Sequence, residues 1–351
     1  MPIAPRFRRV AALQRPFVNR EQVLADFAGE LTRIGAGPRI LNVTGVGGIG
    51  KSRLLRELED RARPRFRTAM IDLQVPALRR QDDALAVLRG QLGSQGVDFD
   101  RFDIAFAVLW QRLHPHLRLG KEELSFIEYG SILGDILDHA SALPVFGTAM
   151  GLVKLFERGS ADIRRRLRIR RDSTLQALDG LPNGELGDAV TYLFAEDLRA
   201  ASASKQSVII VDSYEALVPA PAYTGRTQLA DAWLRDLAGQ LDRALVLIAS
   251  REPLRWEIYD PDWASAIKTS ALSGLPMTAR LELLQAGGVA DPSDRQLIAE
   301  ASAGLPFYLH LAVDTHQRAS GGLDGALVSQ DEILARFLQH VAPRKSGRWR
   351  Y

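Results

Sequence analysis

Five short runs rich in aliphatic and β-branched residues are spaced along the chain. They are Arg39–Thr44, Thr68–Leu73, Val208–Asp212, Ala244–Ala249 and Thr269–Leu272. The third and fourth runs are almost continuously apolar, as expected for strands that are buried on both faces. Stretches with apolar residues at helical spacing separate the runs. This alternation predicts an α/β fold, with a parallel sheet in the middle of three layers.

Between the second and third runs, about 130 residues contain no convincing strand. Three segments there carry apolar residues at helical spacing: Ile104–Leu113, Ser131–His139 and Glu185–Ala201. The dipeptide Asn183-Gly184 indicates a turn before the last of them. We therefore predict a large helical insertion at about residues 76–204.

After the fifth run the chain becomes helical in character. The expected helices are Thr278–Ala286, Asp294–Ala303, Tyr308–Arg318 and Asp331–Val341. The predicted organisation is an amino-terminal arm (1–16), a sheet domain (17–272), an all-α domain (273–341) and a basic tail (342–351).

Composition narrows the function classes. The chain has 351 residues, of which 46% are hydrophobic and 25% charged, so it can bury a sizeable core. It has no cysteine, which excludes disulfides, thiol nucleophiles and thiolate metal sites and fits a cytoplasmic location. The most apolar stretch, residues 140–156, contains Pro144 and Lys154 and is too short and broken to predict a membrane span. The amino terminus lacks the apolar run of a secretory signal.

Charge adds little. The net charge is +3, and 39 of the 45 basic residues are arginine. The densest cluster, Arg164–Arg171, could bind phosphates, but a solvated helix face is the simpler interpretation. His114 and His116 have no third metal ligand at a useful spacing, so we interpret them as ordinary surface or core residues.

The strongest motif is Gly45-Val-Gly-Gly-Ile-Gly-Lys51-Ser52, directly after the first run. It matches G-x-x-x-x-G-K-[ST] in the strand–loop–helix setting that this phosphate-binding loop requires. The glycines let backbone N–H groups face phosphate, Lys51 would reach the β- and γ-phosphates, and Ser52 would ligate Mg²⁺. The predicted nucleotide-binding residues of this segment are Gly45, Gly47, Gly48, Ile49, Gly50, Lys51, Ser52 and Arg53.

An NTP site also needs a carboxylate at the end of a neighbouring strand. Val208-Ile-Ile-Val-Asp212 supplies it, and Asp212 would hold Mg²⁺. Glu215 is the nearest acidic candidate for orienting the attacking water. The fourth run ends in Ala249-Ser-Arg251, and an arginine at a strand's carboxyl end faces the crevice where such sheets bind ligands. Arg251 could therefore sense or stabilise the γ-phosphate, and a surface ion pair is the alternative interpretation. The predicted catalytic residues are Lys51, Asp212, Glu215 and Arg251.

Four ordered motifs together resemble the STAND class of P-loop ATPases, in particular bacterial NB-ARC-like members. They are Phe17-Val-Asn-Arg20-Glu21, the phosphate-binding loop, Leu247-Ile-Ala-Ser-Arg251 and Gly304-Leu-Pro306. The resemblance spans Phe17 to about Val341. It implies a sheet of order 5-1-4-3-2 followed by a helical lid. It also implies that the backbone around Val18 and Arg20 lies near the adenine, that Arg251 is the sensor 1 arginine, and that Pro306 packs near the base.

Three departures from the family pattern matter. Asn19 replaces a glycine in the first motif, and Ser213 stands where an acidic residue often follows the aspartate. The family usually continues into a winged helix and then sensor repeats, whereas this sequence stops after the lid. We therefore expect only the NTPase core and the lid here.

The resemblance implies a switch in signalling, regulation or defence that binds ATP or ADP with Mg²⁺, hydrolyses ATP slowly, and self-associates or joins a larger assembly. Two alternatives stay open: an ordinary P-loop ATPase acting on nucleic acid, and an interaction module clamped by a structural nucleotide.

Overall fold

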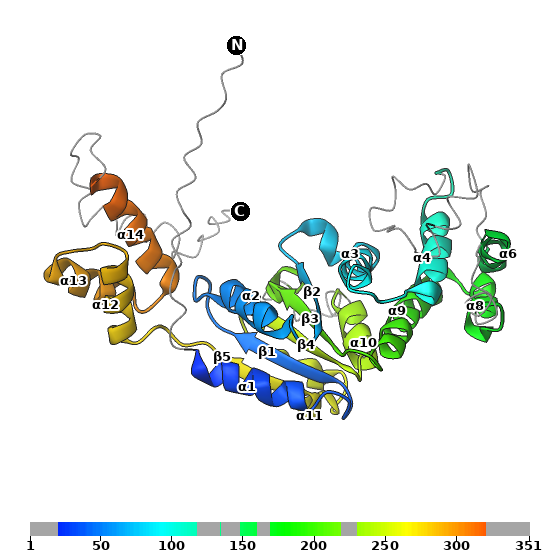
Figure 1. Ribbon diagram of the computed structural model, residues 1–351, viewed down its shortest axis with the longest axis horizontal. Coiled ribbons are helices and arrows are strands. Elements are labelled where there is room, and N and C mark those ends of the chain that lie inside the picture. Colours follow the sequence, from blue (N-terminus) through cyan, green and yellow to red (C-terminus); the bar gives the residue numbers. More distant parts are fainter. Residues whose placement is uncertain (1–19, 118–133, 135–147, 160–168, 219–229, 321–351) are drawn as a thin grey trace, which may run out of the picture. The chain divides into compact units, whose positions relative to one another are not determined.

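The computed structural model describes residues 20–117, 134, 148–159, 169–218 and 230–320 (Figure 1). The chain divides into two compact units. The larger comprises residues 22–45 and 51–271, and the smaller comprises residues 1–21, 46–50 and 272–351. The predicted segments 1–16, Asp331–Val341 and 342–351 lie outside the described residues, as does Ser131–His139 apart from Gly134.

A five-stranded sheet forms the centre of the larger unit. Its strands are β1 (Arg39–Thr44), β2 (Arg67–Asp72), β3 (Ser207–Asp212), β4 (Ala244–Ser250) and β5 (Ile267–Ala271). Their order is β2-β3-β4-β1-β5 and every pair is parallel, which confirms the α/β class and the order 5-1-4-3-2. All residues of β3 and β4 are buried, which explains their nearly continuous apolar sequence.

Helices accompany the sheet in the larger unit (Figure 1). Helix α2 (Lys51–Ala62) packs against β2, β3 and β4. Helix α1 (Glu21–Thr32) lies beside β5, where the Ser270 hydroxyl donates to Asp26 at 2.7 Å. Helices α10 (Ala232–Gln240) and α11 (Trp263–Ala266) precede β4 and β5. These connections run from the carboxyl end of one parallel strand to the start of another.

The described part of the chain between β2 and β3 contains helices and no strand, as predicted. It contains α3 (Gln81–Gly93), α4 (Asp100–Leu113), α6 (Ala149–Gly159), α8 (Ser173–Ala177) and α9 (Asn183–Ala201). Helix α3 packs on β2, while α9 contacts both α4 and α10 and so joins the insertion to the sheet. Stacked and edge-to-face rings of Phe99, Phe102 and Phe194 form its centre. The insertion therefore shares one apolar core with the sheet.

The smaller unit has its own core around α12 (Met277–Ala286), α13 (Pro292–Ala301) and α14 (Pro306–Ser320). Asp291 begins α13 by accepting hydrogen bonds from the N–H groups of Ser293 and Asp294. Gly304 has φ +78°, and a Cβ there would lie 2.7 Å from the Leu275 carbonyl oxygen. Only glycine fits this turn between α13 and α14.

Several predicted boundaries differ from those of the structure. Asn183 and Gly184 form the first turn of α9 rather than a preceding turn, because Pro182 already stands at the N-cap. Helix α13 ends at Ala301, because Ala303 takes φ +50°. Strand β5 begins at Ile267 and ends before Leu272.

Candidate nucleotide-binding site

The phosphate-binding loop joins β1 to α2, in the strand–loop–helix arrangement expected from the motif. Lys51 is the first residue of α2 and is 8% exposed. Its Nζ donates to the carbonyl oxygen of Gly45 at 2.6 Å. Burial lowers the pKa of Lys51, and the nearby carboxylates Glu215 and Asp212 oppose this effect. The Lys51 ammonium is thus bound to the first residue of its own loop, and it lies close to Glu215 and Asp212, the acidic residues predicted for the site.

Two carboxylates meet beside the start of α2. Asp72 and Asp212 end β2 and β3 at the same register position. The Ser52 hydroxyl donates to Asp212, while burial raises the pKa of that carboxyl and Asp72 raises it further. A hydroxyl and carboxylate oxygens are the ligands that Mg²⁺ prefers, so these residues fit the ion implied by the motif. Sequence reasoning missed Asp72, because the predicted strand ran on to Leu73 and so did not place this carboxylate at a strand end.

Glu215 and Arg251 are paired with each other. Arg251 Nε donates to Glu215 Oε1 at 3.1 Å. Glu215 Oε2 is buried without a hydrogen-bond partner among the described residues. The Arg251 side chain is 63% exposed, against 23% for Glu215. The two residues predicted to orient water and to contact the γ-phosphate therefore lie in direct contact.

A buried amide sets the direction of the chain that carries Arg251. Asn42, in the middle of β1, is 0% exposed. Its Nδ2 donates to the Ile248 carbonyl at 3.0 Å and to Ser250 Oγ at 2.8 Å, and its Oδ1 accepts from the Leu254 N–H at 3.1 Å. These bonds anchor both sides of Arg251. Sequence reasoning did not identify Asn42.

In the smaller unit, Gly48 and Ile49 of the glycine-rich loop contact helix α14 and Arg20. The Phe307 N–H donates to the Gly48 carbonyl at 3.3 Å. Arg20 donates to the carbonyls of Ile49 and Ser273, both at 2.9 Å, and burial lowers its pKa. Gly48 has φ +80°, and a Cβ there would lie 3.0 Å from that of Phe307, so the close approach requires glycine.

The other predicted residues are placed as follows. Pro306 is the first residue of α14, Arg53 is exposed on α2, and Gly47 and Gly50 lie in the loop. Val18 lies outside the described residues. In the larger unit, the structure brings together Lys51, Ser52, Asp212, Glu215 and Arg251.

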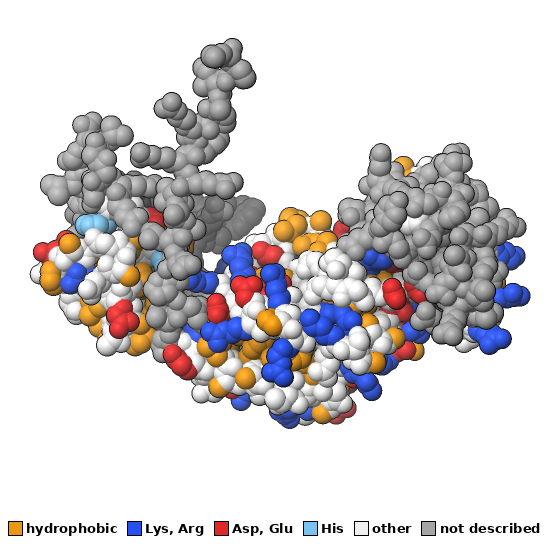
Figure 2. Space-filling model, viewed as in Figure 1, with side chains coloured by type: hydrophobic (Ala, Val, Ile, Leu, Met, Phe, Trp, Pro, Cys, Tyr) orange, Lys and Arg blue, Asp and Glu red, His pale blue; other side chains and the backbone are white. Residues whose placement is uncertain are grey.

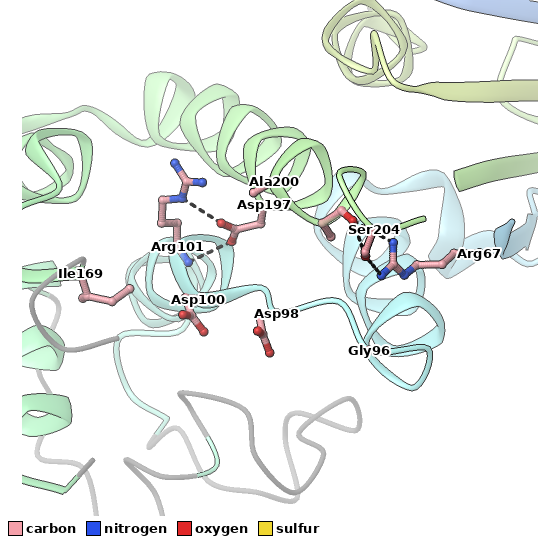
Figure 3. Close-up of a pocket in the computed structure, with 10 residues that line it drawn as sticks. Arg67, Gly96, Asp98, Asp100, Arg101, Ile169, Asp197, Ala200 and Ser204 are labelled. Carbon is pink, nitrogen blue, oxygen red and sulfur yellow. Dashed lines mark hydrogen bonds and ion pairs between the residues drawn. The ribbon is translucent and has the colours of Figure 1, made fainter. Parts of the chain in front are cut away.

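The described part of the insertion contains a separate pocket of about 260 Å³. In Figure 3, Asp197 points toward Arg101, and Arg67 points toward Ser204. Asp197 accepts hydrogen bonds from Arg101 Nε at 2.8 Å and from the N–H groups of Arg101 and Phe102. Arg67 donates to Ser204 Oγ and to backbone carbonyls, including that of Ala201. Asp197 thus joins α9 to α4, and Arg67 joins the end of the insertion to β2.

The structure gives no further support to the histidines and the arginine cluster as candidate ligand-binding residues. His114 Nδ1 donates to the Trp110 carbonyl oxygen at 2.9 Å, and the centroid of its ring lies 4.6 Å from that of Trp110. The described residues contain no cluster of three or more potential metal ligands. Most of Arg164–Arg171 lies outside the described residues. Lys and Arg side chains are mixed with Asp and Glu over the described surface that Figure 2 shows.

No described helix combines the length and apolar character needed to cross a membrane. No family model and no curated protein matches the chain.

Several solved structures are similar to it. One is a signal transduction ATPase with numerous domains and a tetratricopeptide repeat sensor from Pyrococcus horikoshii (14% identity, TM-score 0.39, 93% of this chain and 33% of that one). Another is a Walker-type ATPase of Pyrococcus abyssi (13%, 0.44, 93% and 75%). A third is Drosophila ORC bound to DNA (13%, 0.45, 95% and 64%). The chain thus spans about a third of the length of the first.

Proposed function

We propose that the chain is an ATP- and ADP-binding molecular switch of the STAND type, with slow ATP hydrolysis and nucleotide-controlled self-association. The observation that carries the proposal is the cluster of Lys51, Ser52, Asp212, Glu215 and Arg251 around the start of α2. A bound nucleotide would supply a polyanion for Lys51 and the backbone of the glycine-rich loop. Mg²⁺ would supply charge neutralisation at Ser52 and Asp212.

The Arg251–Glu215 pair gives the switch a way to distinguish its two nucleotides. A γ-phosphate offers Arg251 a stronger anionic acceptor than one carboxylate. ATP would therefore draw Arg251 from Glu215 and leave that carboxylate able to accept a hydrogen bond from water. ADP offers no γ-phosphate, so the pair would persist. Differential contacts of this kind are what shift a two-state equilibrium.

Hydrolysis is expected to be slow for two reasons. Ser213 replaces the acidic residue that often follows the aspartate, so the water-orienting role falls to Glu215, three residues after Asp212. Before ATP binds, Glu215 is also held in an ion pair with Arg251. A switch needs a long-lived ATP state more than rapid turnover. Rapid sustained hydrolysis by the monomer would contradict this assignment.

The first test is the nucleotide carried by the purified protein, released by denaturation and identified by chromatography. Wild type should carry about one ADP per chain, and Lys51→Ala should carry none. Lys268→Ala is the matched control, because Lys268 is an exposed lysine of β5. An empty wild-type site that exchanges ATP freely would favour an ordinary ATPase. Nucleotide retained at wild-type levels in Lys51→Ala would overturn the assignment of the loop.

A further inference from the structure

Tyr214 is a half-buried residue between Asp212 and Glu215 in the sequence, and its hydroxyl is the centre of a hydrogen-bonded cluster that we call the hub. Its hydroxyl donates to Asp231 Oδ2 at 2.5 Å and accepts from Trp256 Nε1 at 3.0 Å. Asp231 and Trp256 are 3% and 1% exposed. The hydroxyl therefore joins three segments that are distant in sequence: the turn after β3, the start of α10 and the loop after β4.

The partners of Tyr214 are themselves fixed. Asp231 forms an ion pair with Arg235, whose guanidinium lies over the Tyr259 ring at 3.9 Å. Trp256 packs edge-on against Trp263, with the ring centroids 5.1 Å apart. These contacts fix the positions of both hydrogen-bond partners of the Tyr214 hydroxyl.

The backbone between Asp212 and Glu215 needs such an anchor. Ser213 has φ +61°, a left-handed conformation that costs a non-glycine residue about 1 kcal/mol or more. The Ser213 N–H donates to Asp212 Oδ1 at 2.8 Å, and the short helix Tyr214–Ala216 follows at once. Backbone in this conformation persists where its surroundings hold it.

Both members of the Glu215–Arg251 pair lie next to this hub in the chain. Glu215 directly follows Tyr214, and Trp256 follows Arg251 by five residues in the same loop. A shift of the Tyr214 side chain would therefore displace the two charged groups relative to each other.

We propose that Tyr214 is a positioning residue, which acts through Asp231 and Trp256 to hold Glu215 and Arg251 in the relative placement that ATP hydrolysis requires. This inference rests on the proposed function. In the step concerned, a water oxygen attacks the γ-phosphorus and the bond to the oxygen bridging the β-phosphorus breaks. The products are ADP, inorganic phosphate and a proton passed to Glu215 or solvent. Tyr214 touches none of the reacting atoms.

The test uses the full chain and the variant Tyr214→Phe, which keeps the ring and removes only the hydroxyl. Single-turnover hydrolysis of ATP should slow about tenfold or more, since small misplacements of catalytic groups carry costs of that size. The dissociation constant for ADP should stay within about twofold, because the hub does not belong to the phosphate-binding loop. Tyr192→Phe is the matched control, because Tyr192 is 42% exposed on α9.

A double-mutant cycle separates positioning from loss of stability. If Tyr214 acts through Glu215, then Tyr214→Phe should have little further effect in a Glu215→Gln background. Trp256→Phe removes the other hydrogen bond of the hub and should lower the rate in the same direction, again without changing ADP affinity. Equal slowing by Tyr214→Phe in both backgrounds would overturn the inference, as would a wild-type rate in Tyr214→Phe. ADP affinity that falls in parallel with the rate would also overturn it.

The outcomes for the two proposals differ. A wild-type protein that binds neither ATP nor ADP refutes the proposed function and this inference with it. A wild-type protein that binds both and hydrolyses ATP, with Tyr214→Phe unaffected, refutes the inference alone.

Discussion

At the residue scale, the cations of the candidate site are held by acceptors that a triphosphate could replace. Lys51 donates to a carbonyl of its own loop, and Arg251 to one carboxylate oxygen. Phosphate oxygens can replace both acceptors, since an ammonium carries three donors and a guanidinium five, and hydrogen bonds between charged groups are the strong ones.

The first residue-scale prediction concerns Arg251→Ala. We expect the affinity for a non-hydrolysable ATP analogue to fall about tenfold to a hundredfold, because a charge-assisted hydrogen bond is worth about 1.5–3 kcal/mol. ADP affinity should change little. Isothermal titration with both nucleotides measures the difference. Arg255→Ala, an exposed arginine of the same loop, is the control. A similar loss for both nucleotides would show that Arg251 does not read the γ-phosphate.

The second residue-scale prediction concerns pH. Burial raises the pKa of Asp197 to about 7, against the opposing effects of the Phe102 N–H and Arg101. Between about pH 4 and pH 7, the folded state therefore keeps a proton that the unfolded state releases. The contribution of Asp197 to the free energy of unfolding should fall as pH rises through this range and level off above it.

Urea unfolding of wild type and Asp197→Asn at a series of pH values checks this sign. The stability of wild type relative to the variant should decline from pH 4 to pH 7. A relative stability that instead rises with pH would mean that Arg101 and the amino terminus of α4 outweigh burial.

At the element scale, the glycine between α13 and α14 should be essential to the smaller unit. Gly304→Ala would combine the strain of φ +78° with contacts of 2.7 Å to Leu275 O and 2.8 Å to Arg280. We expect a loss of about 3 kcal/mol or more in the free energy of unfolding. Gly288→Ala is the matched control, because its φ is +88° but its Cβ would meet nothing within 4 Å. It should lose only about 1–2 kcal/mol. Equal losses would contradict the steric argument.

The elements differ in how far their sequence predicts them. Strands β3 and β4 were predicted because burial on both faces demands continuous apolar residues. Helix α1 was missed, since its buried face contains only Val23, Phe27 and Glu30. Helix α3 was missed as well, because Gly90 and Gly93 interrupt its pattern.

The residues of the candidate site also differ in how far the sequence predicts them. Lys51, Ser52 and Asp212 belong to local motifs next to predicted strands, so sequence alone can propose them. The role of Tyr214 depends on Asp231 and Trp256, which lie 17 and 42 residues away. Asn42 likewise bonds to residues more than 200 positions further along. Such pairings become visible only when the sheet aligns the ends of its strands.

At the scale of the whole molecule, the glycine-rich residues 46–50 group with the all-α unit, while Gly45 and Lys51 group with the sheet unit. The phosphate-binding loop is therefore covalently part of both. In the proposed function, ATP and ADP differ in the contacts that the γ-phosphate makes with the larger unit, and such a difference is what can shift an equilibrium between two states.

The last prediction concerns assembly of the chain. With ADP the chain should stay monomeric, and with a non-hydrolysable ATP analogue and Mg²⁺ it should form a larger species by light scattering after size exclusion. Arg251→Ala should stay monomeric with either nucleotide, because it removes the group that distinguishes them. Lys51→Ala should not respond to nucleotide at all. If wild type and Arg251→Ala assemble equally with ADP and the analogue, assembly does not depend on the γ-phosphate. If instead only DNA promotes assembly, and added salt abolishes the effect, the chain is better described as an ATPase acting on nucleic acid.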